Sequence, residues 1–171
     1  MKKLKFVSFM TLCVILLQIV MPILMEVEWN SVFAVDENTW DVSENGDGSV
    51  IATLSADGTF TVSGKGEMKN YSSSSNRAYN SRANEIKKVV INEGVTRIGD
   101  YAFYGCTSLS SVNIPESITS IGWGAFIECT SLNSINIPES VTSIGEGEFK
   151  GCTSLSSIKI PKSVKIGRAH V

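Results

Sequence analysis

The sequence predicts a solenoid, a fold in which short structural repeats stack into a ladder of parallel strands. The main observation is that one 23-residue unit is written three times without a gap, at 95–117, 118–140 and 141–163. Apolar residues recur at the same positions in every copy, and a proline follows the last of them. Self-similarity at a fixed period of about 20–50 residues is typical of proteins whose neighbouring repeats bury a common core.

The composition excludes some classes of partner. The chain has 171 residues and a formal net charge of −2, and its Lys and Arg residues are scattered along the sequence. A length of this order is enough for one domain. A near-neutral chain without a basic cluster does not favour nucleic acid as a partner, nor electrostatic attachment to an anionic membrane. We expect contact with a membrane only through the N-terminal segment or through an anchor outside this sequence.

Residues 1–34 have the pattern of a secretory signal peptide. Lysines near the start are followed by an almost wholly apolar segment at 6–25, which is broken by Pro22. The Val32-Phe33-Ala34 sequence has the pattern that signal peptidase accepts, so we expect cleavage after Ala34. An uncleaved signal anchor is the alternative, because the apolar run of about 20 residues is near the minimum for a membrane span. Both interpretations place the protein outside the cytoplasm.

Residues 35–84 predict a small antiparallel β element followed by a polar loop. Runs rich in β-branched and aromatic residues lie at 40–42, 50–54 and 59–63. The Ala56-Asp57-Gly58 turn between two of them favours a hairpin. In the Ser- and Asn-rich loop that follows, Tyr71 and Tyr79 are the expected anchors. A terminal repeat exposes an apolar face that must be covered. We therefore favour a cap for this segment, with an independent ligand module as the alternative.

Each repeat is expected to contribute one short strand to the core. In the first copy, Leu109, Val112 and Ile114 have the L-x-x-L-x-L spacing of leucine-rich repeats, which points alternate residues inward. An incomplete copy at 85–94 shows the same spacing 23 residues earlier, so the solenoid is predicted to span 85–163. The predicted fold class is therefore a leucine-rich-repeat solenoid of short parallel strands with turns or short helical segments, preceded by a small antiparallel β cap.

Three positions of the repeat are expected to form ladders inside the core. They are Phe103, Phe126 and Phe149; Cys106, Cys129 and Cys152; and Leu109, Leu132 and Leu155. For the cysteines we favour buried free thiols, which pack as small hydrophobic side chains. A disulfide between adjacent rungs about 4.8 Å apart is geometrically feasible, but an odd number of thiols does not favour it. A metal site is favoured less, because no His, Asp or Glu recurs beside them.

The sequence offers no arrangement typical of an enzyme. The only histidine is His170, so the repeats contain no Ser-His-Asp or Cys-His pairing. Glu116 and Glu139 share one repeat position, where a solvated row on a turn is favoured over acid–base chemistry. Glu148 stands where the other copies have alanine, and we expect it to weaken the third repeat. We therefore expect no catalytic, cofactor-binding or metal-binding residues.

One string in the first full repeat is specific enough to suggest a family. It consists of Ile98-Gly99, Ala102-Phe103, Gly105-Cys106, Leu109, Val112 and Ile114-Pro115. This pattern resembles the BspA-like leucine-rich repeats of bacterial secreted and surface proteins. The upstream sequences 58–64 and 68–71 resemble the segment that commonly precedes such repeats, so the resemblance covers about 40–163. It implies a binding role outside the cell, by adhesion to host proteins or other cells, and no shared catalytic residues.

The outward-facing residues of the predicted strands are the candidates for partner binding, because solenoids present an extended strand face. They are Ser111, Asn113, Ser134, Asn136, Ser157 and Lys159. The alternative is that Ser and Asn are only soluble, strand-compatible residues. Aromatic and arginine side chains carry more contact energy at interfaces. In the repeats these lie near the bends, at Arg97, Tyr101, Tyr104 and Trp123.

We expect a secreted or cell-surface protein that binds an extracellular protein or glycan. The alternatives are a docking module of a larger exported enzyme and a purely structural spacer. At 164–171 a fourth copy begins one residue short of the regular pattern and then ends. Residues 166–171 resemble the translation of a sequencing adapter. We therefore expect 164–171 to be a truncated repeat with an artefactual tail.

Overall fold

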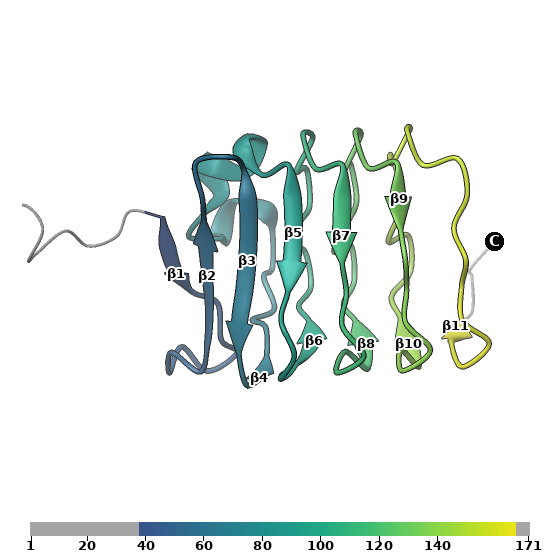
Figure 1. The fold of residues 1–171 in the computed structure, drawn as a ribbon, viewed down its shortest axis with the longest axis horizontal. Helices are drawn as coiled ribbons and strands as arrows, with labels where there is room; N and C mark the ends of the chain where they lie inside the picture. The colour runs from purple at the N-terminus through teal and green to yellow at the C-terminus, as the bar shows by residue number, and fades with distance from the viewer. Residues whose placement is uncertain (1–37, 167–171) are drawn as a thin grey trace, which may run out of the picture. The chain divides into compact units, whose positions relative to one another are not determined.

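A computed structural model describes residues 38–166 of the chain. The predicted signal peptide and the last five residues, which include most of the expected artefactual tail, lie outside these described residues. Between 38 and 166 the framework consists of two sheets, in the strand orders β1-β2-β3-β5-β7-β9 and β11-β10-β8-β6-β4. Strands from successive repeats lie side by side (Figure 1), as the predicted solenoid requires. Within the same range, no helix has the length and apolar character needed to span a bilayer.

The six-stranded sheet begins with an N-terminal meander of three antiparallel strands. These are β1 (Thr39–Asp41), β2 (Val50–Leu54) and β3 (Thr59–Gly64). At the turn between β2 and β3, Gly58 has a φ of 87°, and the Asp57 carboxylate accepts hydrogen bonds from the Ser55 hydroxyl and the Thr59 N–H. β3 then pairs in parallel with β5. The meander and the repeats therefore share one continuous sheet.

The rest of this sheet is built from the core strands of the repeats. They are β5 (Lys88–Ile91), β7 (Ser111–Asn113) and β9 (Ser134–Ile135), all parallel. Lys88 pairs with Ser111, and Ser111 pairs with Ser134. Each step is 23 residues, so the sequence period equals one rung of the ladder. The incomplete copy at 85–94 supplies β5, where the spacing predicted a strand.

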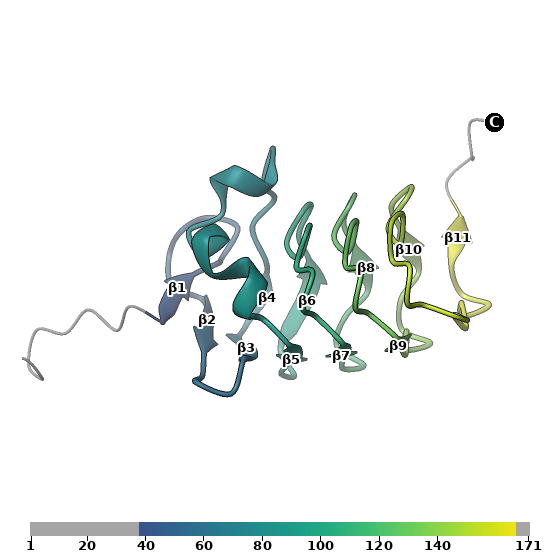
Figure 2. The same ribbon diagram turned by 90° about the horizontal axis from the view of Figure 1, so that it is seen from above.

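A second parallel sheet, which the sequence analysis did not predict, forms the opposite side of the repeats (Figure 2). Its strands are β4 (Gly66–Glu67), β6 (Val95–Ile98), β8 (Ser120–Ile121), β10 (Ser143–Ile144) and β11 (Lys165–Ile166). Ser120 pairs with Ser143 at the regular step of 23 residues, whereas Ser143 pairs with Lys165 at a step of 22. The fourth copy therefore lacks one residue before β11, and β11 still pairs with β10.

The polar loop after β4 contains two 3₁₀ helices, η2 (Ser74–Asn76) and η3 (Asn80–Glu85), and is held down by buried side chains. Tyr71 and Tyr79 are buried, and the Tyr79 hydroxyl donates to the Ala102 carbonyl at 2.7 Å. The Arg77 side chain is also buried and donates to the Ala102 carbonyl at 3.0 Å and to Asn80 Oδ1 at 2.9 Å. These bonds attach the loop to the turn of the first full repeat.

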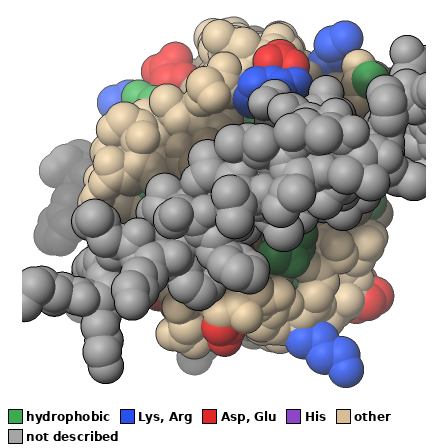
Figure 3. Space-filling view, turned by 90° about the vertical axis from the view of Figure 1, so that its left-hand side faces the viewer, with side chains coloured by type: hydrophobic (Ala, Val, Ile, Leu, Met, Phe, Trp, Pro, Cys, Tyr) green, Lys and Arg blue, Asp and Glu red, His purple; other side chains and the backbone are tan. Residues whose placement is uncertain are grey.

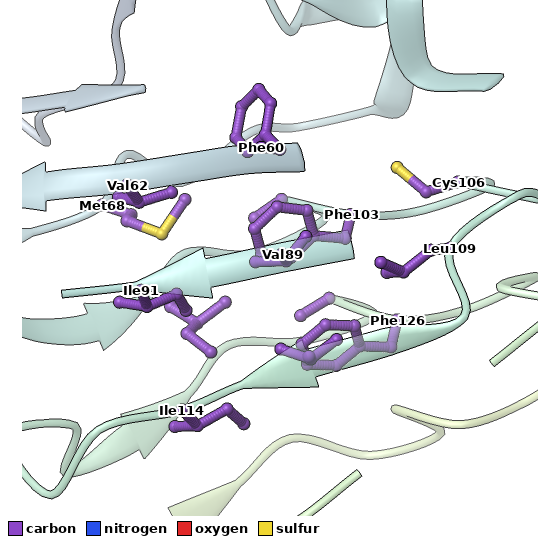
Figure 4. Packing of buried hydrophobic residues seen from close by; sticks show 14 of the residues in the cluster. Phe60, Val62, Met68, Val89, Ile91, Phe103, Cys106, Leu109, Ile114 and Phe126 are labelled. Atoms are coloured by element: carbon purple, nitrogen blue, oxygen red, sulfur yellow. The ribbon is translucent and has the colours of Figure 1, made fainter. Parts of the chain in front are cut away.

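The core lies between the two sheets, and stacked aromatic rings run through it. Phe103 and Phe126 stack with ring centroids 5.5 Å apart, and Phe126 and Phe149 stack at 6.0 Å. Phe60 of the meander meets Phe103 edge-on at 5.9 Å, so the ring column continues into β3 (Figure 4). Phe103 and Phe126 are fully buried, whereas Phe149 and Leu155 of the third repeat are only partly buried.

Candidate functional site

The six predicted partner-binding residues lie on the outward face of the six-stranded sheet, here named the strand face. Asn113, Ser134, Asn136, Ser157 and Lys159 are exposed, and Ser111 is half-buried. Ser111 lies opposite Ser134, and Asn136 lies opposite Lys159. Alternate residues such as Val112 and Ile135 point into the core, since side chains along a strand alternate between its faces. The structure therefore brings the six residues into two adjoining rows.

The strand face extends beyond the repeats, which the sequence analysis missed. Thr53 of β2 pairs with Thr61 of β3, Thr61 pairs with Val90 of β5, and Val90 pairs with Asn113. A row of the repeats thus continues across the meander through residues on the same face of the sheet. The alternation of apolar and polar residues in 59–63 indicated which side chains face outward. Only the pairing of β3 with β5 shows that these outward side chains lie on the same surface as those of the repeats.

This surface offers hydrogen-bonding groups and few charges. Its rows carry mostly hydroxyl and amide side chains, with Val90 as an apolar residue and Lys88 and Lys159 as the cations among the paired residues named above. Figure 3 shows a different side of the molecule, its β1 end, where the visible acidic and basic side chains are scattered. The strand face can bind partners through many moderate hydrogen bonds, whereas aromatic anchors are the usual source of concentrated contact energy.

The cysteines of the repeats are free and buried. The Cys129 thiol donates to the Phe103 carbonyl and the Cys152 thiol to the Phe126 carbonyl, both at 3.1 Å. Burial raises the pKa of the Cys106 thiol to about 11, and burial also raises the pKa of the other two thiols. Thiols held protonated in this way are poor nucleophiles and poor metal ligands. No cluster of His, Cys, Asp and Glu suited to a metal occurs between residues 38 and 166.

Glu148 has a structural role that the sequence analysis missed. Its side chain is only 3% exposed, and its two carboxyl oxygens accept hydrogen bonds from the Gly124 and Ala125 N–H groups, both at 2.9 Å. In the preceding pair of rungs, a backbone carbonyl serves one of the equivalent N–H groups, since Tyr101 N donates to the Trp123 carbonyl at 2.9 Å. Burial raises the pKa of Glu148 to about 8, against the opposing effect of its two donors. The Glu148 carboxyl therefore supplies the hydrogen-bond acceptors for two backbone N–H groups of this turn.

The acidic row after the strand prolines has the position expected for solvated side chains. Glu116 and Glu139 are exposed on turns. The serine that follows each of them bonds to the first residue of its own copy, one turn of the solenoid earlier. The Ser117 hydroxyl donates to the Val95 carbonyl and the Ser140 hydroxyl to the Ile118 carbonyl, both at 2.7 Å. The serine of the recurring Glu-Ser pair thus ties the end of each copy to its beginning.

A second group of side chains lies on the turns that join the two sheets. Tyr101 meets Trp123 edge-on with centroids 4.8 Å apart, and Tyr104 meets Tyr101 at 5.7 Å. Trp123 is 46% exposed. Arg97, the remaining candidate, pairs with Asp100 at 2.9 Å and donates to Asn70 Oδ1 at 2.7 Å. We name Tyr101, Tyr104 and Trp123 the aromatic ridge.

Comparison with known proteins supports the repeat assignment. The sequence model described as "BspA type Leucine rich repeat region" matches residues 73–170 in six copies. The solved structure of a leucine-rich repeat protein from Eubacterium ventriosum is similar at 30% identity and a TM-score of 0.63, over 75% of this chain and 39% of that chain.

Two further solved structures match over shorter or looser superpositions. A leucine-rich repeat protein from Bacteroides ovatus is 43% identical with a TM-score of 0.46, over 48% of this chain and 21% of that chain. The T. pallidum leucine rich repeat protein is 28% identical with a TM-score of 0.48, over 70% of this chain and 51% of that chain. The chain thus spans less than two thirds of each of these proteins. Among curated proteins, none matches it.

Proposed function

The chain belongs to the BspA-type leucine-rich repeat family, and from this premise we propose that it is a secreted or cell-surface protein that binds an extracellular protein or glycan. The observation that carries the proposal is the strand face, a largely polar surface that continues from the meander into the repeats, with the half-buried Val90 among its hydroxyl and amide side chains. Repeat proteins use such extended faces for recognition. Ser111, Asn113, Ser134, Asn136, Ser157 and Lys159 are the proposed contact residues.

Two accompanying assignments belong to the same proposal. Residues 1–34 act as the export signal, as their sequence pattern suggests. The meander acts as the cap of the solenoid. The contact of Phe60 with Phe103 and the pairing of β3 with β5 support this assignment, because they cover the first rung. No observation among the described residues favours a docking module of an exported enzyme over this binding role.

The strand face has little aromatic surface, so its affinity must come from many contacts. A net contribution of about 1 kcal/mol for each hydrogen bond is typical. A ligand that follows several rungs, spaced about 4.8 Å apart, gains from each repeat it crosses. Polymeric ligands, either an extended protein segment or a glycan chain, therefore fit this face better than small molecules.

The test is a binding measurement with the purified chain against a panel of extracellular-matrix proteins and cell-wall glycans. The strand-face variant carries Asn113→Lys and Asn136→Lys. The matched control carries Thr96→Lys and Ser143→Lys, which change two exposed residues of the second sheet. We expect at least one ligand to bind, and the strand-face variant alone to lose most of its affinity. Equal loss in both variants would contradict the proposed surface, and no binding to any ligand would support the spacer alternative.

A further inference from the structure

The aromatic ridge departs from the repeat pattern at a position where the backbone disfavours it. Tyr101 has a φ of 56°, and its counterparts one and two repeats later are Gly124 and Gly147, with φ of 64° and 70°. Glycine adopts this left-handed region at little cost, whereas other residues are strained there. A tyrosine retained at such a position points to a function of its side chain.

The side chain of Tyr101 supports Trp123. Its ring lies against Gly124, because a Cβ added to Gly124 would come within 3.4 Å of Tyr101 Cδ1 and Cε1. The edge-on contact with Trp123, with ring centroids 4.8 Å apart, then fixes the indole in place. Trp123 nevertheless stays 46% exposed. Tyr101 therefore supports an aromatic side chain that remains open to solvent.

Carboxylates lie at the same repeat position on the rungs before and after Trp123. Asp100 and Glu146 stand 23 residues on either side of it. The Trp123 backbone N–H donates to Asp100 Oδ1 at 3.0 Å, so the first carboxylate is adjacent to the Trp123 backbone. Asp100 also pairs with Arg97, whereas Glu146 is exposed. Rungs of a parallel ladder are about 4.8 Å apart, which places Glu146 within reach of a group that rests on the indole.

The turns around the aromatic ridge carry a small excess of negative charge and leave room for a ligand. Asp100 is paired with Arg97, whereas the exposed Glu128 and Glu146 stand against the single cation of Lys150 in segments 97–105, 120–128 and 143–151. At Gly147, in the rung after Trp123, an added Cβ would meet no atom within 4 Å. An exposed indole beside open space and unbalanced carboxylates is complementary to a cation.

We propose that Trp123 and Glu146, with Tyr101 as a positioning residue, form a binding site for an arginine or lysine side chain of a basic segment in a partner protein. A guanidinium or ammonium on the face of a tryptophan gains a cation–π attraction, and a neighbouring carboxylate adds an ion pair. The site lies on the turns and not on the strand face, and it stands independently of the proposed function.

The experiment titrates the full chain with a synthetic oligo-arginine peptide, followed by calorimetry. Two probes test its chemistry: the same peptide with neutral citrulline in place of arginine, and an uncharged oligosaccharide. We expect the arginine peptide to bind, with an affinity that falls as salt is raised, and the other two probes not to bind. Equal binding of the citrulline peptide or of the oligosaccharide would overturn the proposal, as would no binding of the arginine peptide.

Variants then locate the site. Trp123→Ala is expected to weaken binding roughly three- to tenfold, as the loss of a cation–π contact predicts. Glu146→Lys changes an exposed side chain and so leaves the fold intact, and it is expected to abolish binding. Tyr101→Gly restores the residue of the other copies, and should weaken binding while thermal stability is retained. The control Asn113→Ala with Asn136→Ala should leave the affinity unchanged. Unchanged affinity in Trp123→Ala or Glu146→Lys would refute the site.

Discussion

The buried carboxyl of Glu148 makes stability depend on pH in a direction opposite to that of most acidic residues. Its pKa in the folded protein is about 8, compared with an ordinary value of 4.5. The folded state therefore holds a proton that the unfolded state releases as the pH rises above 4.5. This stabilisation is fully present below pH 4.5 and is lost as the pH rises through about 8.

The magnitude follows from the displacement of the pKa. A tenfold change in proton affinity is worth about 1.36 kcal/mol, so the displacement from 4.5 to about 8 corresponds to at most about 5 kcal/mol. We expect a measured change on the order of 2 kcal/mol. The ionised carboxyl keeps two N–H donors, and its turn lies next to the partly buried Phe149, so water can enter when the charge forms.

The assay is urea unfolding at about pH 5 and about pH 8.5, a window that separates Glu148 from the exposed carboxyls, which titrate at lower pH. Burial also raises the pKa of the repeat thiols, so they add a smaller loss of stability of the same sign near pH 8.5, and this loss is common to the wild type and the variant. The variant Glu148→Gln keeps one acceptor and loses the titrating group. It should be less stable than the wild type by about 1–3 kcal/mol at the lower pH, and it should lack the pH dependence assigned to Glu148. Parallel pH profiles for the two proteins would refute this account of the carboxyl.

Three further predictions concern other features of the repeats. Glu128 has a φ of 60°, whereas its counterparts Gly105 and Gly151 are glycines, so its backbone is strained. In thermal unfolding, Glu128→Gly should raise the unfolding free energy by about 1 kcal/mol and Gly105→Ala should lower it by a similar amount. A lower unfolding midpoint in Glu128→Gly would contradict the strain. The cysteines of the repeats should resist alkylation in the folded protein and react after unfolding, as read by mass spectrometry; labelling under native conditions would show that they are accessible. Arg77→Met should cost roughly 2–4 kcal/mol in urea unfolding, because buried carbonyls lose a donor. The exposed control Lys162→Met should cost less than about 0.5 kcal/mol, and equal costs would remove Arg77 from the attachment of the loop.

The sequence was sufficient for the period of the fold and for the strands of its first sheet. The spacing of Leu109, Val112 and Ile114 identifies β7, because three apolar residues at fixed intervals leave few other arrangements. The second sheet was missed because β8 and β10 are two residues long and lie among serines and threonines. Such strands exist only because the neighbouring rung supplies their hydrogen bonds. A single copy, considered alone, carries no signal for them.

The missed parts of the candidate sites share one physical cause. Arg77 has the appearance of a solvated residue in a polar loop, yet its guanidinium meets the Ala102 carbonyl 25 residues away. Glu148 replaces the alanine of the other copies, yet backbone N–H groups of the previous rung donate hydrogen bonds to its carboxyl. The partners in both cases are backbone atoms, whose positions are encoded by the fold and not by the identity of any residue. Side-chain patterns alone therefore give no sign of these contacts.

The serine hydroxyl bonds have a consequence for how such a gene can change. Ser117, Ser140 and Ser163 each donate to a carbonyl 22 residues earlier, so the donor and the acceptor of each bond lie within one copy. Duplicating or deleting a whole unit therefore leaves each remaining serine with its own acceptor. Recombination between the near-identical copies can thus lengthen or shorten the array in steps that fold immediately. The number of rungs is then a quantity that can vary between strains without any new interaction having to evolve.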